Sequence, residues 1–217
     1  MANVAHKNIT GTDLHEPKGI AAAAINTLYV ADGAASGSWT TAPKAGRWVL
    51  ISSQTPAATA TVNFTGFSSS VYQDYQIVLD HFIPATDDSS LWMRTSTDAG
   101  STYDSGSTNY MYANNGRNTA GTTGATSNGD AKIVLTGAGV GNATGEFLSG
   151  IIRIINPGAA ARCSVLWELF YHDATGRLTA VVGGGIRDAA ADVDAARLLF
   201  SAGNITSGTA KFYGLGI

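Results

Sequence analysis

The stretch "YQDYQIVLDHFIP", residues 72–84, shows the pattern that decides the fold. Tyr75, Ile77 and Leu79 occupy alternate positions, and the positions between them carry Gln, Val and Asp. Side chains of an extended strand point to opposite faces in turn, so this spacing places the three apolar side chains on one face. A period of two over this length predicts a β-strand with one buried face.

Segments of the same kind follow one another from Arg47 to the end of the chain. Turn signals separate them about every 8–15 residues, and no long segment has a period of 3.6. We therefore expect an all-β fold, a jelly-roll-like antiparallel β-sandwich of roughly ten strands. Besides residues 72–84, the segments are "RWVLISSQ", "ATATVNFTGF", "SLWMRTSTD", "AKIVLTG", "GEFLSGIIRIINPG", "RCSVLWELFYHD", "GRLTAVVGGGI", "ARLLFSAG" and "TAKFYGLGI".

Two of these segments are apolar at odd and even positions alike. They are "GIIRIINP" and "CSVLWELF", and we predict that both are central strands. Glu168 interrupts the second segment and, in a core or an interface, would need a partner such as Arg153. A structural ion pair is favoured over a role with Glu146 as paired carboxylates for glycoside cleavage. Gly183–Gly185 predict a bulge or a close backbone approach, and 188–197 predict a helix or a loop.

The N-terminal residues have a different character from the rest. Residues 1–45 hold no alternating segment longer than "INTLYVAD", and they end in the linker-like "GAASGSWTTAPKAG". Ala21–Ala24 could form one helical turn, which is marginal because nucleation costs more than one turn returns. We therefore divide the chain into an extended arm with its linker, 1–45, and a β-sandwich domain, 46–217.

Composition excludes several classes of function. The net charge is -3 and no run of Lys or Arg occurs, which argues against nucleic-acid binding. There is one cysteine, Cys163, so no disulfide within the chain and no zinc cluster is expected. No apolar stretch reaches the length of about 18 residues that a membrane span needs. The "HEPKG" cluster lacks the second histidine of a zinc-protease helix, so we expect no metal and no cofactor.

Candidate chemistry within the sandwich is sparse. His81 and His172 are the histidines of this part, and both lie in strand-like segments where a structural role is favoured. We therefore expect no catalytic residues and no enzyme activity. Tyr103, Tyr110 and Tyr112 lie in a loop-like region rich in Asn, Ser and Gly, a composition typical of adaptable recognition loops. These tyrosines could contact a glycan, or they could pack on their own sheet.

Two longer stretches resemble a known class of proteins. "HKNITGTDLHEPKGIAAAAINTLYVADGAASGSW" resembles a module at the N-terminus of tailed-bacteriophage virion proteins, including fibre-like and minor structural proteins. "FSSSVYQDYQIVLDHFIPATDDSSLWMRTSTDAGSTYDSG" and the final "FYGLGI" are similar to the β-rich distal domain of such proteins. The resemblance implies a virion protein, assembled in the host cytoplasm. It also implies a fibre or spike that forms a homo-oligomer, a trimer, and displays its sandwich toward host cell-surface glycans.

The arm would then dock on other virion proteins. Its predicted contacts are the turn-forming cluster and the apolar anchors around it, namely Leu14, His15, Glu16, Pro17, Lys18, Gly19, Ile20, Ile25, Leu28, Tyr29 and Trp39. An alternative is a capsid decoration, or cement, protein, which would be present in many copies where fibres are few. A glycan depolymerase is the least favoured alternative, because carboxylates are scarce and no β-helix repeat is present.

Overall fold

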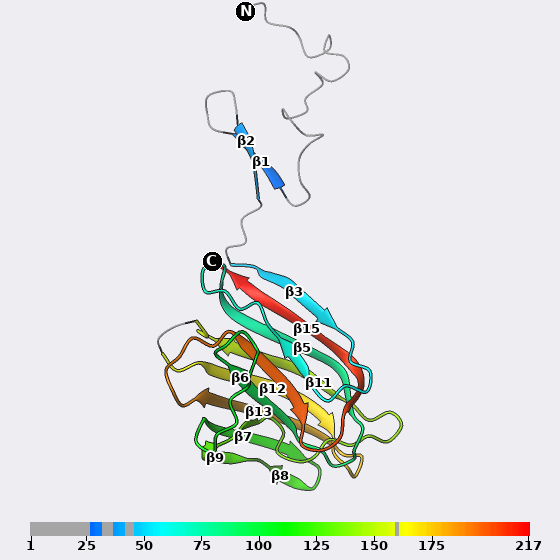
Figure 1. Cartoon of the computed structure of the whole chain (residues 1–217). Helices are drawn as coiled ribbons and strands as arrows, with labels where there is room; N and C mark the ends of the chain where they lie inside the picture. The colour runs from blue at the N-terminus through cyan, green and yellow to red at the C-terminus, as the bar shows by residue number, and fades with distance from the viewer. Residues whose placement is uncertain (1–26, 32–36, 42–45, 159–160) are drawn as a thin grey trace, which may run out of the picture. The chain divides into compact units, whose positions relative to one another are not determined.

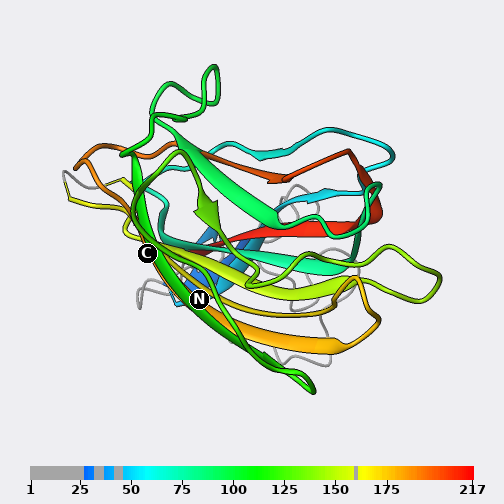
Figure 2. The same ribbon diagram turned by 90° about the horizontal axis from the view of Figure 1, so that it is seen from below.

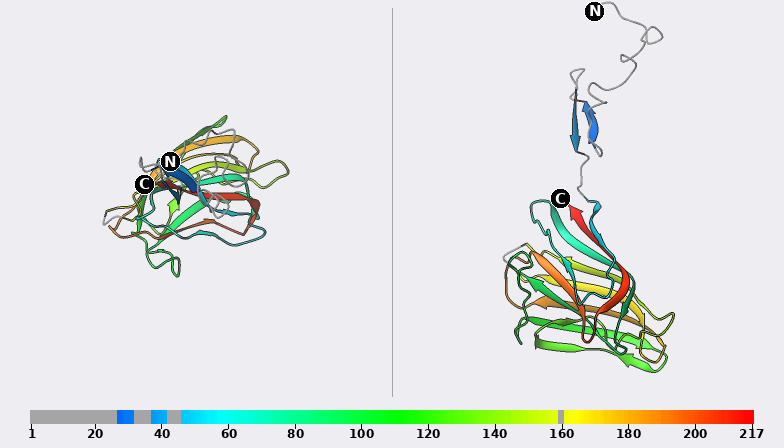
Figure 3. Two further views of the ribbon diagram at one scale, coloured as in Figure 1. Left: turned by 90° about the horizontal axis from the view of Figure 1, so that it is seen from above. Right: turned by 45° about the vertical axis from the view of Figure 1, so that its right-hand side comes forward.

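The computed structural model describes residues 27–31, 37–41, 46–158 and 161–217. The chain divides into two units, Met1–Pro43 and Lys44–Ile217. In the first unit, strands β1 (Thr27–Ala31) and β2 (Gly37–Thr41) form an antiparallel pair, drawn in blue in Figure 3. The second unit holds the remaining strands and is described by itself below.

The second unit is built from antiparallel strands alone. In the part of the chain that the structure describes, no helix has the length and apolar character of a membrane span. The strands are β3 (Trp48–Gln54), β4 (Val62–Phe64), β5 (Tyr72–Pro84), β6 (Leu91–Ser96), β7 (Tyr110–Asn118), β8 (Gly121–Thr123), β9 (Thr126–Asp130), β10 (Ile133–Val134), β11 (Leu148–Ile155), β12 (Ser164–His172), β13 (Leu178–Arg187), β14 (Ala195–Phe200) and β15 (Ile205–Gly216).

These strands form two sheets that pack as a sandwich. The four-stranded sheet has the order β10-β6-β14-β4. The nine-stranded sheet has the order β3-β15-β5-β11-β12-β13-β7-β8, and β9 also pairs with β7 (Figure 1). Figure 2 views the two layers from below. The all-β sandwich expected from the sequence is confirmed, and β11 and β12 are central strands as predicted.

The path of the chain between the sheets is that of a jelly roll. β3 lies in the large sheet, β4 in the small, β5 in the large, and β6 and β10 in the small; β11, β14 and β15 then alternate large, small, large. This alternation closes an eight-stranded double sheet. The remaining strands, β7 to β9 and the β12–β13 hairpin, are insertions that extend the large sheet beyond β11.

An aromatic cluster fills the space between the sheets. Tyr75 and Phe212, on neighbouring strands of the large sheet, stack with ring centroids 5.2 Å apart. Phe64 of the small sheet lies 5.4 Å from Phe212, and Phe67 lies 5.2 Å from it on centroids. Tyr75 and Phe212 have no exposed surface. The apolar residues that alternate in 72–84 are therefore core residues.

A tight turn fixes the β12–β13 hairpin in register. The Asp173 carboxylate accepts hydrogen bonds from the Thr175 amide and hydroxyl, at 2.9 and 2.6 Å, and from Asn118 Nδ2 of β7 at 2.9 Å. Burial alone would raise the pKa of Asp173, but the two bonds from Thr175 and one from the Arg177 amide hold that pKa below its ordinary value. Gly176 supplies the positive φ of +76° that closes the turn.

Two local expectations left alternatives open, and the structure decides between them. In 188–197 the loop forms instead of the helix: residues 188–194 are irregular and β14 begins at Ala195. The amides of Val193 and Asp194 donate to the carbonyls of Pro157 and Ser96, so they are not available to a helical turn. The glycines of β13 form no bulge, because the strand keeps continuous register with β12 and β7. Close packing is present at Gly183, where the side chain of Trp167 makes the approach.

Candidate interaction surface

The large sheet has one face turned away from the four-stranded sheet, and this face carries apolar side chains. β12 shows the contrast: Val165, Trp167 and Leu169 are buried against the core, whereas Leu166 is 49% and Phe170 is 43% exposed. A strand that is apolar on both faces is typical of a sheet covered on both sides. Among the described residues, one side of β12 is covered and the other is open.

Strand register places exposed and half-buried apolar residues beside one another in a continuous patch. We call this patch the outer apolar face and define it by Val78, Ile151, Leu166, Phe170, Val182 and Ile186, from β5, β11, β12 and β13. Val182 is 58% exposed. Patches of this kind on a folded protein mark sites of interaction.

The outer apolar face is uneven, with projecting side chains and hollows between them. Leu166 lies opposite Gly184 across the β12–β13 pair, and a shallow hollow of about 420 Å³ lies beside them over Ala113. A second hollow, of about 630 Å³, is lined by Phe170, Val182 and their neighbours. Large side chains therefore alternate with hollows, which is the shape that interdigitating packing requires.

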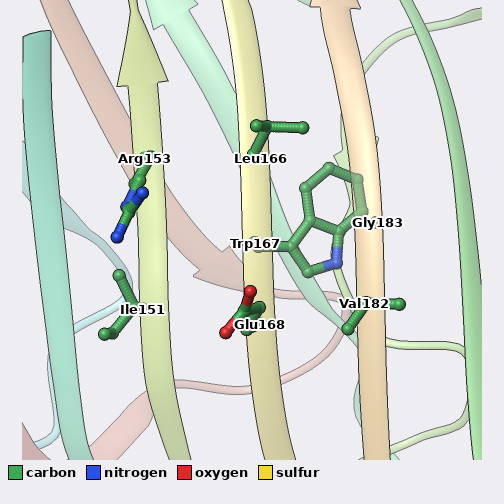
Figure 4. Close-up of a pocket in the computed structure, with 7 residues that line it drawn as sticks. All are labelled: Ile151, Arg153, Leu166, Trp167, Glu168, Val182 and Gly183. Atoms are coloured by element: carbon green, nitrogen blue, oxygen red, sulfur yellow. The ribbon is translucent and has the colours of Figure 1, made fainter.

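Two opposite charges lie in the middle of this face. Ile151 pairs with Glu168 and Arg153 pairs with Leu166, so Arg153 and Glu168 occupy diagonal positions on adjacent strands (Figure 4). Both side chains are exposed. Within the described ranges neither of them makes an ion pair or a hydrogen bond. The Arg153–Glu168 ion pair favoured from the sequence is therefore not formed within the described chain.

The adjacent glycines of β13 face opposite sides, which gives a matched pair of tests. A Cβ at Gly183 would lie 2.2 Å from Cζ2 of Trp167, whereas one at Gly184 would meet nothing closer than Leu166 Cδ2 at 3.4 Å. We expect Gly183→Ala to lower the free energy of unfolding by about 2 kcal/mol through overpacking. Gly184→Ala should raise it by about 0.5–1 kcal/mol by restricting the unfolded chain. Urea titrations of dilute protein measure both; equal losses would contradict the assigned faces.

The three tyrosines proposed for glycan contact lie elsewhere, and two of them are in the core. Tyr110 has no exposed surface, and its hydroxyl accepts a hydrogen bond from the Thr95 amide at 2.8 Å. Tyr112 is 9% exposed. The ring of Tyr103 is covered by the Arg197 guanidinium, 3.8 Å from its centroid. Tyr110 and Tyr112 pack on their own sheet, and burial leaves no face of Tyr110 for stacking on a sugar.

Both histidines of the second unit contact Phe147, His172 from a half-buried position and His81 from an exposed one, and Cys163 is buried. His81 stacks on Phe147 at 4.3 Å between ring centroids, and His172 lies 5.4 Å from the same ring. His81 Nδ1 lies 2.7 Å from a carboxylate oxygen of Asp80. Burial raises the pKa of the Cys163 thiol to about 12, so this thiol is protonated at neutral pH. Among the described residues, no group of three or more acidic, histidine or cysteine side chains could hold a metal ion.

The predicted docking residues divide between described and undescribed segments. Tyr29 and Trp39 are opposite one another in the β1–β2 pair, and Leu28 is in β1. The other docking residues, from Leu14 to Ile25, lie outside the described residues. Sequence reasoning did not propose the outer apolar face as a site. The sequence pattern that could have indicated it is the apolar character of both faces of "GIIRIINP" and "CSVLWELF".

Comparisons with known proteins add no relative to this picture. No protein-family model, no curated protein and no solved structure matches the chain. The resemblance to phage virion proteins therefore rests on the quoted stretches of sequence alone.

Proposed function

We propose that this chain is a non-enzymatic structural protein of a tailed-phage virion, a fibre or spike that works as a homo-oligomer. The observation that carries the proposal is the outer apolar face. Large apolar side chains such as Leu166 and Val182 are exposed near the middle of the large sheet. A protein that assembles with others buries such a surface, whereas an isolated one keeps it in water at a cost.

The resemblance supplies the kind of assembly. It supports placement on a tailed-phage particle, a trimeric state and docking through the arm at 1–45. A capsid decoration protein is the second candidate, because arm and sandwich suit both places. The burial of Tyr110 and Tyr112 removes two of the three residues that supported a glycan contact, so host recognition is not part of this proposal.

The proposal predicts that the protein is present on purified virions. Antibody against the sandwich should label particles in electron micrographs, and quantitative mass spectrometry should count its copies relative to the major capsid protein. A few copies grouped at one place on the particle support a fibre or spike. Many copies spread over the head support the decoration protein instead. Virions without the protein, made by a host in which it is expressed, would contradict both.

A further inference from the structure

We infer that the outer apolar face is covered by the same face of a neighbouring copy of this chain, with Arg153 of one copy paired to Glu168 of the next. The inference rests on the homo-oligomer of the proposed function, and it assigns the copies a two-fold contact in place of the three-fold one that the resemblance implies. It does not depend on where the oligomer sits on a particle.

The contact surface reaches a stable size when the strands beside the outer apolar face are included. The face lies on β5, β11, β12 and β13, and β15 and β7 flank it. These six neighbouring strands span about 24 Å at the usual strand spacing, and nine residues along β13 span about 26 Å. The footprint is thus on the order of 600 Å² per copy, which reaches the lower end of stable interfaces. Packing one such face on another is the ordinary way in which sheets bury apolar side chains.

The charges of Arg153 and Glu168 indicate which partner covers the outer apolar face. Arg153 and Glu168 lie diagonally across one strand pair, and within the described residues neither has a partner. A surface of uniform charge, such as an acidic protein patch or an anionic lipid layer, would pair with one of them and bury the other unpaired, at high cost. The same face on a second copy, turned about an axis between the two residues, offers Glu168 to Arg153 and Arg153 to Glu168. This reciprocal pairing of one face with itself is a two-fold contact, so it joins the copies in pairs.

The shape of the outer apolar face fits the same partner, a second copy of the chain. Leu166 projects beside the hollow over Gly184 and Ala113, so a second copy brings both a projecting leucine and a hollow to the contact. A self-complementary surface of this kind needs no further sequence element to cover it.

Charge exchange in the full-length chain tests the inference. Arg153→Glu and Glu168→Arg each place like charges opposite one another, and each should raise the dissociation constant of the oligomer by about 30-fold or more. The double variant Arg153→Glu/Glu168→Arg restores opposite charges between copies and should return most of that loss. Sedimentation equilibrium over a range of protein concentrations measures all four proteins, and circular dichroism verifies that each is folded.

An apolar variant and a control make the test independent of the charges. Val182→Lys, at an outward position, should also dissociate the oligomer. Val71→Lys changes an exposed valine that precedes β5 and lies off the outer apolar face, so it should leave association unchanged. Val182 and Val71 are 58% and 37% exposed, so neither exchange disrupts the core.

The outcomes separate the inference from the proposed function. A wild-type oligomer that persists in Val182→Lys and in both single charge variants overturns the inference while the oligomer stands. Dissociation of the single variants without recovery in the double variant overturns the Arg153–Glu168 pairing. A wild-type protein that is monomeric at every concentration overturns the inference and the oligomer together. Labelling of virions is measured separately, so placement on the particle can stand or fall by itself.

Discussion

Deletion of Met1–Pro43 is expected to leave a folded sandwich that no longer joins the virion. Among the described residues, the hydrophobic core cluster runs from Val62 to Phe212 and lies in the second unit, Lys44–Ile217. The deletion leaves all of these core residues in place. The truncated protein should give the same β-rich circular dichroism and a similar urea midpoint, while its amount on purified particles falls to background.

The size of the effect follows from the predicted anchors. Each apolar side chain such as Leu14 or Ile20 contributes about 1.5–3 kcal/mol when it is fully buried. Ordering the segment costs about 1–2 kcal/mol for each backbone residue that is fixed, which offsets much of this gain. A margin of several kcal/mol per arm is multiplied by avidity when an oligomer presents several arms at once. Loss of all arms should therefore be close to an all-or-none loss of attachment.

Graded variants and a graft complete this experiment. Leu14→Ala combined with Pro17→Gly removes one anchor and one fixed bend, so incorporation should be intermediate. Met1–Pro43 fused to an unrelated small trimer should bring that trimer onto the particle. Truncated protein found on virions at the normal copy number would show that the sandwich holds the attachment surface. In that case, the arm would have another purpose.

The fold could be predicted from the sequence because its long strands obey a simple rule. Tyr75, Ile77 and Leu79 alternate in the sequence and are all buried in the core. The short strands β8 and β9 were not separable in the polar stretch around them, because three to five residues carry too little pattern. The composition of the residues before β14 left a helix and a loop open, and the backbone hydrogen bonds to Pro157 and Ser96, which fix the irregular path, come from distant segments.

The candidate surface could be predicted only in part. Apolar residues on both faces of "CSVLWELF" indicated a doubly covered strand, but not which face the protein itself would cover. The neighbours of Leu166, Arg153 on β11 and Gly184 on β13, follow from the register of three strands, which local patterns do not give. For the tyrosines, the loop-like composition left contact with a glycan and packing on their own sheet both open. Strand β7 begins at Tyr110 and places both Tyr110 and Tyr112 on its inner side.

The same substitution in the core and on the outer apolar face is expected to have very different effects. Phe212→Ala removes a fully buried ring that contacts Phe64, Phe67 and Tyr75. It should lower the free energy of unfolding by about 4 kcal/mol, the loss typical of phenylalanine truncation in a core. Urea unfolding followed by tryptophan fluorescence measures this change. A loss below about 1 kcal/mol would show that the aromatic cluster is not the centre of the sandwich.

Phe170→Ala removes the same atoms from a ring that is 43% exposed. In dilute, dissociated protein its cost should stay below about 1.5 kcal/mol, because water already reaches the ring. Subunit association stabilises a fold by mass action, so the wild-type urea midpoint should rise with protein concentration. Phe212→Ala should lower the urea midpoint at every protein concentration and keep its rise with concentration, since its ring does not reach the interface. Phe170→Ala should flatten the rise, because it weakens the contact between copies; an unchanged rise in this variant would place the contact on another face.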